Sequence, residues 1–304
     1  MDRFEAMSML LAVVEQGSLS AAGRTLRVPV PTLSRKLSDL EALLGTRLLI
    51  RTTRKLSLTD AGIAYVAAAR RILEQLDEAE REAAGEYTEP KGDLVITAPI
   101  LFGRLHVLPV VADFLAEFPE IDVRLALSDR NVDLVGDQVD MAVRIGALAD
   151  SSMIATRVGS MRSVVCGSPD LLARHGDPAT PDDLARFPCV GVDVFSPGFS
   201  GTTWQMRMPG AKTPVAVPIR PRLLVSTAEA AAQAAVMSVG LTRLLHYQVA
   251  DAVAAGTLRI VLADHEIAPA PINLIHAGRG QLPLKMRRFL DFAAPRLRER
   301  ARPF

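Results

Sequence analysis

The chain has 304 residues, enough for about two domains of roughly 150 residues each. It is 49% hydrophobic, 23% charged and 5% aromatic, a composition that excludes a disordered chain, a collagen-like repeat and a small disulfide-stapled scaffold. Its longest uncharged stretches, such as residues 230–242, are too short to cross a bilayer, and the first residues lack the pattern of a secretory signal. We therefore expect a cytoplasmic protein that makes no membrane contact.

The net charge of +1 is unevenly distributed along the chain. Residues 24–55 carry eight Lys or Arg against two acids, whereas residues 70–89 carry three Arg against seven acids. A basic block beside an acidic one indicates a module that faces nucleic acid, followed by a segment that faces something else.

Three helices are predicted over residues 4–44. Apolar residues recur at helical spacing over residues 4–14, Ser18 is placed to cap a second helix, and Pro31 suits the first turn of a third. The third helix buries a leucine stripe, made of Leu33, Leu37, Leu40 and Leu44. Its opposite face is polar and basic, and we expect it to contact DNA through Pro31, Thr32, Ser34, Arg35 and Ser38. The arrangement is typical of a helix-turn-helix, although a three-helix bundle with solvated charges fits the pattern equally well.

Two short strands are predicted next, over residues 48–50 and 56–58. The tip between them carries three cations and two hydroxyls within five residues, whereas a plain surface turn rarely needs so much charge of one sign. We expect phosphate or minor-groove contacts from Arg51, Thr52, Arg54 and Lys55 at this tip. Residues 1–60 then form a winged helix-turn-helix DNA-binding domain.

A further pattern runs through about sixty N-terminal residues, at Phe4, Val13–Ala22, Thr32–Arg35, Leu40, Glu41, Leu44, Gly45, Leu48, Leu49, Arg51–Arg54 and Leu58–Gly62. In these residues and their spacing the chain resembles the LysR-type transcriptional regulators. One departure concerns the start of the third helix, where the family usually has Ser-Gln-Pro and this chain has Pro29-Val30-Pro31. The hydroxyl cap and the amide that often touches a base are both absent. We therefore expect Val30 to read DNA by apolar contact or not at all.

A longer helix is predicted to follow Thr59, which can cap it. Its apolar residues repeat with the spacing of a coiled-coil seam, namely Tyr65, Ala69, Ile72, Leu76, Ala79 and Ala83. The seam favours an antiparallel partner helix, and packing on the chain's own domain is the alternative. The resemblance implies a homodimer through this helix and, commonly, a homotetramer. Residues 61–91 would thus be the dimerisation helix and a hinge, the hinge lying at residues 85–92.

Two recognition helices held by one dimer would meet successive major grooves about 34 Å apart. The expected partner is therefore double-stranded DNA with an imperfect inverted repeat. The resemblance further implies promoter contact, with RNA polymerase as a partner, and a location at the nucleoid.

Residues 92–304 alternate between strand and helix, which predicts an α/β architecture with parallel sheets. Strands are predicted at residues 94–98, 122–127, 141–145, 154–158, 164–166, 189–192, 215–219 and 223–225, and helices at 105–118, 131–138, 229–237, 248–255 and 284–294, the last ending before Pro295. Pieces that extend the resemblance over the whole chain are Phe114, Phe118, Pro119, Val139–Gly146, Gly240, Leu241 and Ala255–Leu258. The resemblance implies a two-lobed, periplasmic-binding-protein-like (type 2) effector-binding domain, with lobe 1 at residues 92–161 and 266–304 and lobe 2 at 162–265. The overall fold class is α+β.

Ligands of open α/β sheets bind beyond the carboxyl ends of the strands, often against helix N-termini. The expected effector cleft is formed by Pro99, Ile100, Leu101, Phe102, Gly103, Ser128, Arg130, Arg144, Ile145, Gly146, Thr202, Thr203, Ser226 and Thr227. Arg130 or Arg144 would pair with an anionic effector, to which the hydroxyls would donate. The first of these loops is apolar where many family members have hydroxyls. It favours an aromatic or hydrophobic effector over a small dicarboxylic acid, but the sequence is compatible with either kind of effector.

No catalytic constellation, metal site or cofactor motif stands out. The five histidines are scattered without HExxH or paired i, i+4 spacing, and no GxSxG elbow or glycine-rich phosphate loop occurs. Cys166 and Cys189 lack metal-site spacing and are expected to be reduced core thiols. The leading hypothesis is a non-enzymatic, sequence-specific transcription factor controlled by a small-molecule effector. The alternative is a cytoplasmic small-molecule-binding or enzymatic α/β protein whose N-terminal helices only oligomerise, a role that does not need the cationic face.

Overall fold

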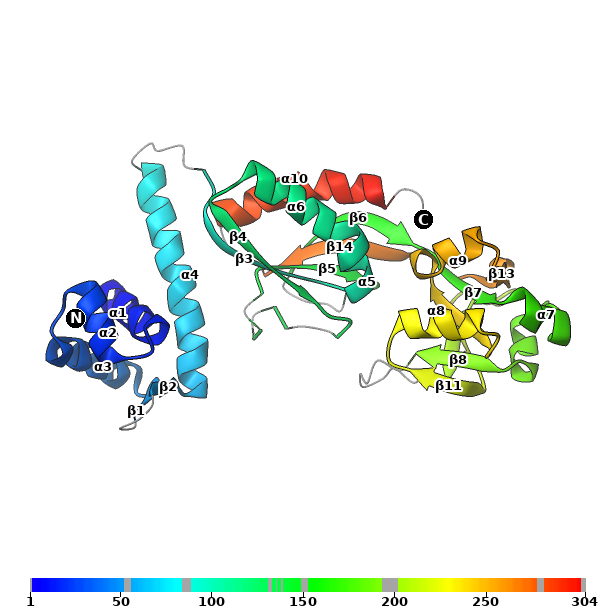
Figure 1. Ribbon diagram of the computed structural model, residues 1–304, viewed down its shortest axis with the longest axis horizontal. Coiled ribbons are helices and arrows are strands. Elements are labelled where there is room, and N and C mark those ends of the chain that lie inside the picture. Colours follow the sequence, from blue (N-terminus) through cyan, green and yellow to red (C-terminus); the bar gives the residue numbers. More distant parts are fainter. Residues whose placement is uncertain are drawn as a thin grey trace. The chain divides into compact units, whose positions relative to one another are not determined.

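The computed structural model divides the chain into two units, Met1–Glu89 and Pro90–Phe304 (Figure 1). The residues that the structure describes are 2–51, 56–83, 89–130, 133–134, 136–137, 139–148, 153–192, 202–277 and 282–301. None of the described helices is long and apolar enough to span a membrane.

Three helices close around an apolar core in the first unit. They are α1 (Arg3–Glu15), α2 (Leu19–Leu26) and α3 (Val30–Leu44). Ser18 caps α2 as predicted, since its hydroxyl accepts from the Ala21 N–H at 3.1 Å. The buried core side chains are Ala6, Met9, Leu10, Val13, Ala22, Leu33, Leu37, Leu40, Leu48 and Leu49. Leu44 is 39% exposed, because α3 ends there at the left-handed Gly45, so the predicted leucine stripe stops at Leu40.

The turn between α2 and α3 brings two backbones into close contact. Arg27 adopts a left-handed conformation with a φ of 55°, and the Val28 N–H donates to the Gly23 carbonyl at 2.9 Å. A Cβ atom on residue 23 would lie 2.8 Å from the Val28 carbonyl oxygen. Glycine at position 23 therefore permits the close approach that sets the entry into α3.

A strand pair and a long helix complete the first unit. The strands β1 (Leu49–Arg51) and β2 (Leu56–Leu58) pair antiparallel and lead into α4 (Asp60–Ala83). Thr59 caps α4, since its hydroxyl accepts from the Gly62 N–H at 2.9 Å. A Cβ atom on Gly62 would lie 2.1 Å from the Leu48 carbonyl oxygen, so α4 begins in direct backbone contact with the residue before β1.

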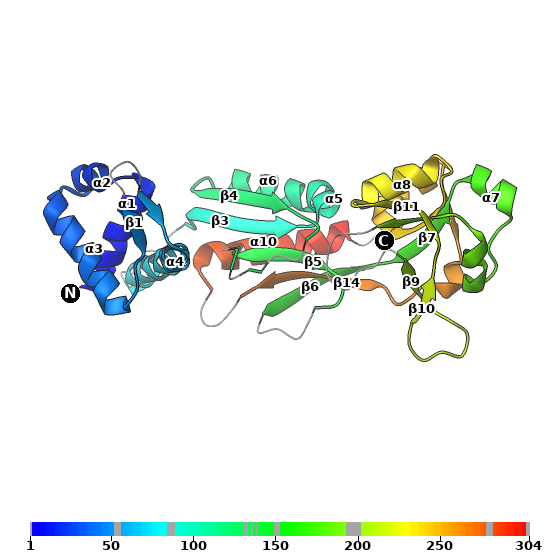
Figure 2. The ribbon, with the colours of Figure 1, turned by 90° about the horizontal axis from the view of Figure 1, so that it is seen from below.

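The second unit contains a first five-stranded sheet in the order β4-β3-β5-β14-β6 (Figure 2). Its strands are β3 (Gly92–Ala98), β4 (Ile121–Leu127), β5 (Met141–Ile145), β6 (Ile154–Met161) and β14 (Ala270–His276). The helices α6 (Leu108–Glu117) and α10 (Leu284–Arg300) pack on one face, where Phe114 meets Phe289 and Phe292. Because β3 runs parallel to both of its neighbours, the carboxyl ends of β3, β4 and β5 lie at the same edge of the sheet.

A second five-stranded sheet follows in the order β11-β8-β12-β7-β13. Its strands are β7 (Ser163–Gly167), β8 (Cys189–Val192), β11 (Pro221–Val225), β12 (Leu241–Leu245) and β13 (Arg259–Val261). The helices α8 (Ala228–Val236) and α9 (Ala250–Ala254) pack on one face. The other face is covered by α7 (Pro169–His175) and the hairpin of β9 (Thr203–Met206) and β10 (Val215–Pro218).

The sheets differ from the sequence prediction because both are mixed rather than parallel. β14 pairs antiparallel with β5 and β6, and β7 pairs antiparallel with β12 and β13. The sequence pattern does not predict α7, β9, β12, β13 or β14. In the stretch predicted as a helix at residues 131–138, the described residues Leu134, Gly136 and Asp137 form a turn.

The helix α10 continues through Pro295, where the sequence predicts an end. Its last turn is held by burial, since Leu297 is 1% exposed and Ala301 is 7% exposed. Arg296 adds a local contact: its Nη1 donates to the Phe292 carbonyl at 3.1 Å, and its guanidinium lies 3.4 Å from the centre of the Phe292 ring. Packing thus outweighs the roughly 3 kcal/mol that a proline costs inside a helix.

The close approach at Gly62 gives a stability prediction. Gly62→Ala should destabilise the first unit by about 1–3 kcal/mol, because the new methyl group would collide with the Leu48 carbonyl. Helix propensity alone predicts the opposite, a gain of up to about 1 kcal/mol. Urea unfolding of the full chain measures the sign. Ala64→Gly, at an exposed position of α4, serves as the control for the propensity effect. A stabilised Gly62→Ala variant would contradict the packing described here.

Candidate functional site

The side of α3 opposite the core is the candidate nucleic-acid interface. Burial of Leu33, Leu37 and Leu40 fixes which side of the helix remains at the surface. Of the contacts predicted on this helix, Pro31, Arg35 and Ser38 are exposed, whereas Thr32 and Ser34 are half-buried. In the part of the chain that the structure describes, Arg35 forms no ion pair, so its guanidinium is available to a ligand.

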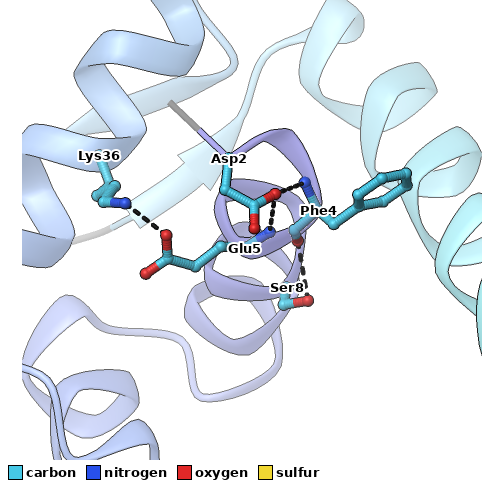
Figure 3. A network of polar contacts seen from close by, with 5 residues as sticks. All are labelled: Asp2, Phe4, Glu5, Ser8 and Lys36. Carbon is cyan, nitrogen blue, oxygen red and sulfur yellow. Dashed lines mark hydrogen bonds and ion pairs between the residues drawn. The ribbon is translucent and has the colours of Figure 1, made fainter.

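Lys36, the cation next to Arg35, has a structural role. Its ammonium group forms an ion pair with the Glu5 carboxylate of α1 (Figure 3). Figure 3 also shows the Asp2 cap of α1, whose carboxylate accepts from the Phe4 N–H at 2.9 Å. Lys36 therefore helps to hold α3 against α1. Fewer cations of the basic block at residues 24–55 are available to bind DNA than the sequence alone indicates.

Glu41 anchors the start of the wing, a role that sequence reasoning missed. Its carboxylate oxygen Oε1 accepts from the backbone N–H groups of Leu48 and Leu49, at 2.8 and 3.0 Å. Both leucines are buried, so these donors would otherwise lose their hydrogen bonds with water. The signal in the sequence was an acid within a strongly basic block, a few residues before a predicted strand.

Most of the contacts predicted at the wing tip fall outside the part of the chain that the structure describes. Thr52, Arg54 and Lys55 lie outside the described residues. Arg51 is the last residue of β1, and its side chain lies outside the described part of the chain. The wing itself is confirmed as an antiparallel strand pair with Leu49 opposite Leu58.

The predicted dimerisation seam on α4 divides into two parts. Ala69 is fully buried and Tyr65 packs against the core of the first unit, which matches packing on the chain's own domain rather than on a partner. Ile72 is 38% exposed and Leu76 is half-buried, so they remain accessible in a single chain. The side chains of the two remaining seam positions, Ala79 and Ala83, lie outside the described residues.

The second unit brings the predicted effector residues of lobe 1 together at the carboxyl edge of its sheet. The segments that follow β3, β4 and β5 are joined by hydrogen bonds: the Ser128 N–H donates to the Ala98 carbonyl at 2.9 Å, and Arg144 Nη1 donates to the Arg130 carbonyl at 3.1 Å. Arg144 is half-buried, and burial lowers the pKa of its guanidinium. Gly146, which follows β5, has a φ of +118° that favours glycine.

The first of these segments is helical rather than a loop. Ile100–Phe102 forms the short helix α5, which continues through a π-helical turn at Gly103–Val107 into α6. The Asp129 carboxylate accepts from the Ile100 N–H at 3.0 Å, so this helix start already carries an acidic side chain that the sequence analysis did not select. Ile100 is 37% exposed, whereas Phe102 is 1% exposed and Gly103 is buried. Phe102 and Gly103, which were predicted to contact the effector, are therefore packed in the core.

The predicted effector residues of lobe 2 lie in two different places. Ser226 and Thr227 follow β11, and the Thr227 hydroxyl caps α8 by accepting from the Ala230 N–H at 3.2 Å. Ser226 is exposed. Thr203 begins β9 in the separate two-stranded sheet, and the Thr202 carbonyl accepts from the Ile219 N–H at 2.9 Å.

Contacts between the two lobes surround this region of the second unit. Arg104, in the turn after α5, forms an ion pair of 3.0 Å with Glu229 in the first turn of α8. The Phe102 ring meets the ring of Tyr247, which follows β12, edge to face at 5.6 Å between centroids. Burial raises the pKa of Tyr247, and its hydroxyl accepts from Gln248 Nε2 at 3.3 Å. These groups lie next to the predicted effector residues on both lobes.

The chain crosses between the lobes twice, and one ion pair joins the two crossings. Arg162 lies between β6 and β7, and Glu266 lies between β13 and β14. The guanidinium donates from Nε and Nη2 to the two carboxylate oxygens, at 2.9 and 2.8 Å. This hydrogen-bonded pair raises the pKa of Arg162. The two crossing segments are thereby held side by side.

Both cysteines of the chain are buried core residues. Burial raises the pKa values of the Cys166 and Cys189 thiols to about 12, so both remain protonated, and both are free as predicted. No group of three His, Cys, Asp or Glu side chains that could hold a metal ion occurs among the residues described.

Two family models match the chain, and together they cover most of it. Residues 4–63 match the bacterial regulatory helix-turn-helix protein, lysR family, and residues 88–298 match the LysR substrate binding domain. An HTH-type transcriptional regulator of Xanthomonas campestris pv. campestris (strain 8004) is 33% identical over 289 residues, which cover 95% of this chain and 84% of that protein.

Solved structures agree with these matches. CrgA, a LysR-type transcriptional regulator from Neisseria meningitidis, is 31% identical with a TM-score of 0.59, covering 96% of this chain and 98% of that one. Full-length LysG from Corynebacterium glutamicum, with bound effector Arg, shares the fold with a TM-score of 0.64 at 21% identity, covering 98% of each chain. The winged helix-turn-helix and the two-sheet second unit thus occur together in known regulators. The chain belongs to the LysR family of DNA-binding transcriptional regulators, with an effector-binding domain behind its helix-turn-helix.

Proposed function

We propose that this regulator binds an imperfect inverted repeat in double-stranded DNA as a homodimer, placing α3 of each copy in the major groove. The observation that carries the proposal is the one-sided burial of α3, which leaves Arg35 at the surface without an ion-pair partner among the described residues. The wing cations Arg51, Arg54 and Lys55 would add phosphate or minor-groove contacts and a dependence on salt. Thr32, Ser34, Ser38 and Thr52 would add hydroxyl contacts to the same duplex.

Pairing of the copies is assigned to the part of α4 that follows Ala69. Ile72 and Leu76 are accessible there, and Ala79 and Ala83 continue the same heptad spacing. Pairing of dimers into tetramers and contact with RNA polymerase at the promoter belong to the same proposal. Such a regulator would work in the cytoplasm, at the nucleoid.

Control by a small molecule is assigned to the edge formed by residues 99–101, 128–130 and 144–146, with Ser226 and Thr227 opposite. Arg144 supplies a half-buried cation, and Ile100 supplies exposed apolar surface at the same edge of the sheet. A cation next to apolar surface suits an aromatic or other organic acid. Binding would regulate transcription only to the extent that the effector binds one arrangement of the lobes more tightly than the other.

The alternative function, a small-molecule-binding or enzymatic protein with an N-terminal oligomerisation module, has less support. It leaves the exposed face of α3 without a purpose, and the described residues hold no metal-binding cluster. The relatives named above are described as regulators.

Footprinting on the region upstream of the chain's own gene tests the proposal. Arg35→Ala should weaken binding by about 1–3 kcal/mol and relax the base preference at one position of each half-site. Arg54→Ala should instead weaken binding on all sequences and lower the salt slope by about 1. Arg298→Ala, which removes an exposed arginine from α10, is the charge-matched control. If the Arg35→Ala protein bound with unchanged affinity and unchanged base preference, α3 would not be the element that recognises the bases.

The anchor of the wing gives a second test. Glu41→Ala should destabilise the first unit by about 1–3 kcal/mol, because it leaves buried N–H groups of Leu48 and Leu49 without their acceptor. It should also weaken DNA binding on every sequence, since a loosened wing loses its phosphate contacts. Glu41→Gln keeps a carbonyl acceptor and should lie between the wild type and Glu41→Ala. Equal stability of all three proteins in urea would show that the two hydrogen bonds do not hold the wing.

The effector assignment is tested with a panel of acids that includes benzoate and succinate. A bound acid should raise the Tm of the second unit, and Arg144→Ala should weaken that binding about tenfold or more by removing a charge-assisted hydrogen bond. Arg124→Ala, at an exposed position of β4, is the control. A preference for benzoate over succinate would favour the aromatic class. If the acid bound equally well to a folded Arg144→Ala protein, the anion site would lie elsewhere in the chain.

A further inference from the structure

The first turn of α3 presents apolar surface at the start of a helix whose outer side is polar and basic. Val30 is the first residue of the helix and is 38% exposed, and its neighbours Pro29 and Pro31 are exposed as well. Prolines have no N–H group, so Val30 carries the one backbone donor among these three residues. This surface, Pro29–Pro31, therefore has few hydrogen-bond donors to offer to a polar partner.

The position of Val30 is fixed by the close turn that precedes it. The Val30 Cγ2 atom lies 3.4 Å from the point where a Cβ on Gly23 would be, so one methyl group is turned towards α2. The exposed part of the residue, 38%, faces outwards. A β-branched side chain in a helix has essentially one favoured rotamer, so this surface is held in place before any ligand arrives. A contact made by Val30 would therefore cost little side-chain entropy.

We infer that Val30 reads a thymine in each half-site by apolar contact with its 5-methyl group, an inference that rests on the proposed insertion of α3 in the major groove. Residues in the first turn of a recognition helix are the ones that reach base edges. In the major groove the thymine methyl is the apolar feature among hydrogen-bonding groups. Val30 has no side-chain donor or acceptor. Against any other base edge it would remove water from polar atoms without replacing their hydrogen bonds.

The surroundings of Val30 supply the attraction that the valine lacks. Arg35 is exposed one turn beyond the exposed Pro31, on the side of α3 that faces away from the core, so a duplex drawn to its charge lies close to the first turn of the helix. Arg35 can donate to a guanine or a phosphate, whereas Val30 adds discrimination that does not depend on charge. The contribution of Val30 should therefore persist at salt concentrations that weaken the rest of the interface.

Deoxyuridine tests the inference, because it differs from thymidine by the 5-methyl group alone. Each thymine of the footprinted half-sites is replaced in turn by deoxyuridine, and binding of the full chain is measured. At one thymine per half-site the Kd should rise about fourfold, the value expected for one buried methyl group. The same replacement in Val30→Ala should have no effect, because the contact is already lost. Leu43→Ala removes another exposed apolar side chain of α3 and should keep the full deoxyuridine penalty.

Three outcomes would overturn the inference. In the first, the wild type binds its operator and no deoxyuridine replacement changes the affinity; this outcome leaves the proposed function intact. In the second, the penalty persists in Val30→Ala, which assigns the methyl contact to another residue. In the third, the wild type fails to bind the operator at all, and the proposed function falls with it. The first outcome uses the wild type alone, so it remains decisive if Val30→Ala does not fold.

Discussion

One-sided burial of α3 is the constraint on which the DNA-binding unit depends. Three leucines fix the rotation of the helix about its own axis, and that rotation decides which side chains a duplex can meet. The polar contacts at its flanks serve the same end, because Lys36 ties the helix to α1 and Glu41 ties it to the wing. A surface ion pair such as Lys36–Glu5 stabilises a protein little, but here it and the Glu41 hydrogen bonds also fix the orientation of α3. The interface is thus positioned by groups that need not touch DNA themselves.

The second unit obtains its candidate ligand-binding edge from topology. Because β3, β4 and β5 run parallel, three chain segments that are distant in sequence end side by side. The hydrogen bond of Arg144 to the Arg130 carbonyl and that of Asp129 to the Ile100 N–H then join these segments to one another. A ligand that changed one of these contacts would change its neighbours, which is the kind of coupling a regulatory domain needs.

The parts of the fold that rest on local pattern could be predicted from the sequence. The leucine stripe of α3 and the Ser18 cap are examples, because spacing and capping act within a few residues. Contacts between distant residues could not be predicted: Glu41 looks like one more surface acid, and β14 joins its sheet more than a hundred residues after β5. Pro295 shows the same limit, since its helix is continued by burial of later residues rather than by its own preference. The candidate residues of lobe 1 could be grouped from the sequence because they follow strands, whereas Asp129 was missed because its partner is a backbone N–H of another segment.

The order of strands in the second unit has a consequence for the synthesis of the protein. Among the described strands, β6 joins its sheet through β14, which comes near the end of the chain. The other sheet is complete once β13 has been made. During translation lobe 2 can therefore fold while lobe 1 still lacks β14 and α10. A ribosome that stalls or a chain that is truncated after residue 261 would release a protein with one finished lobe and a β6 edge open to other chains, a state that chaperones and proteases recognise.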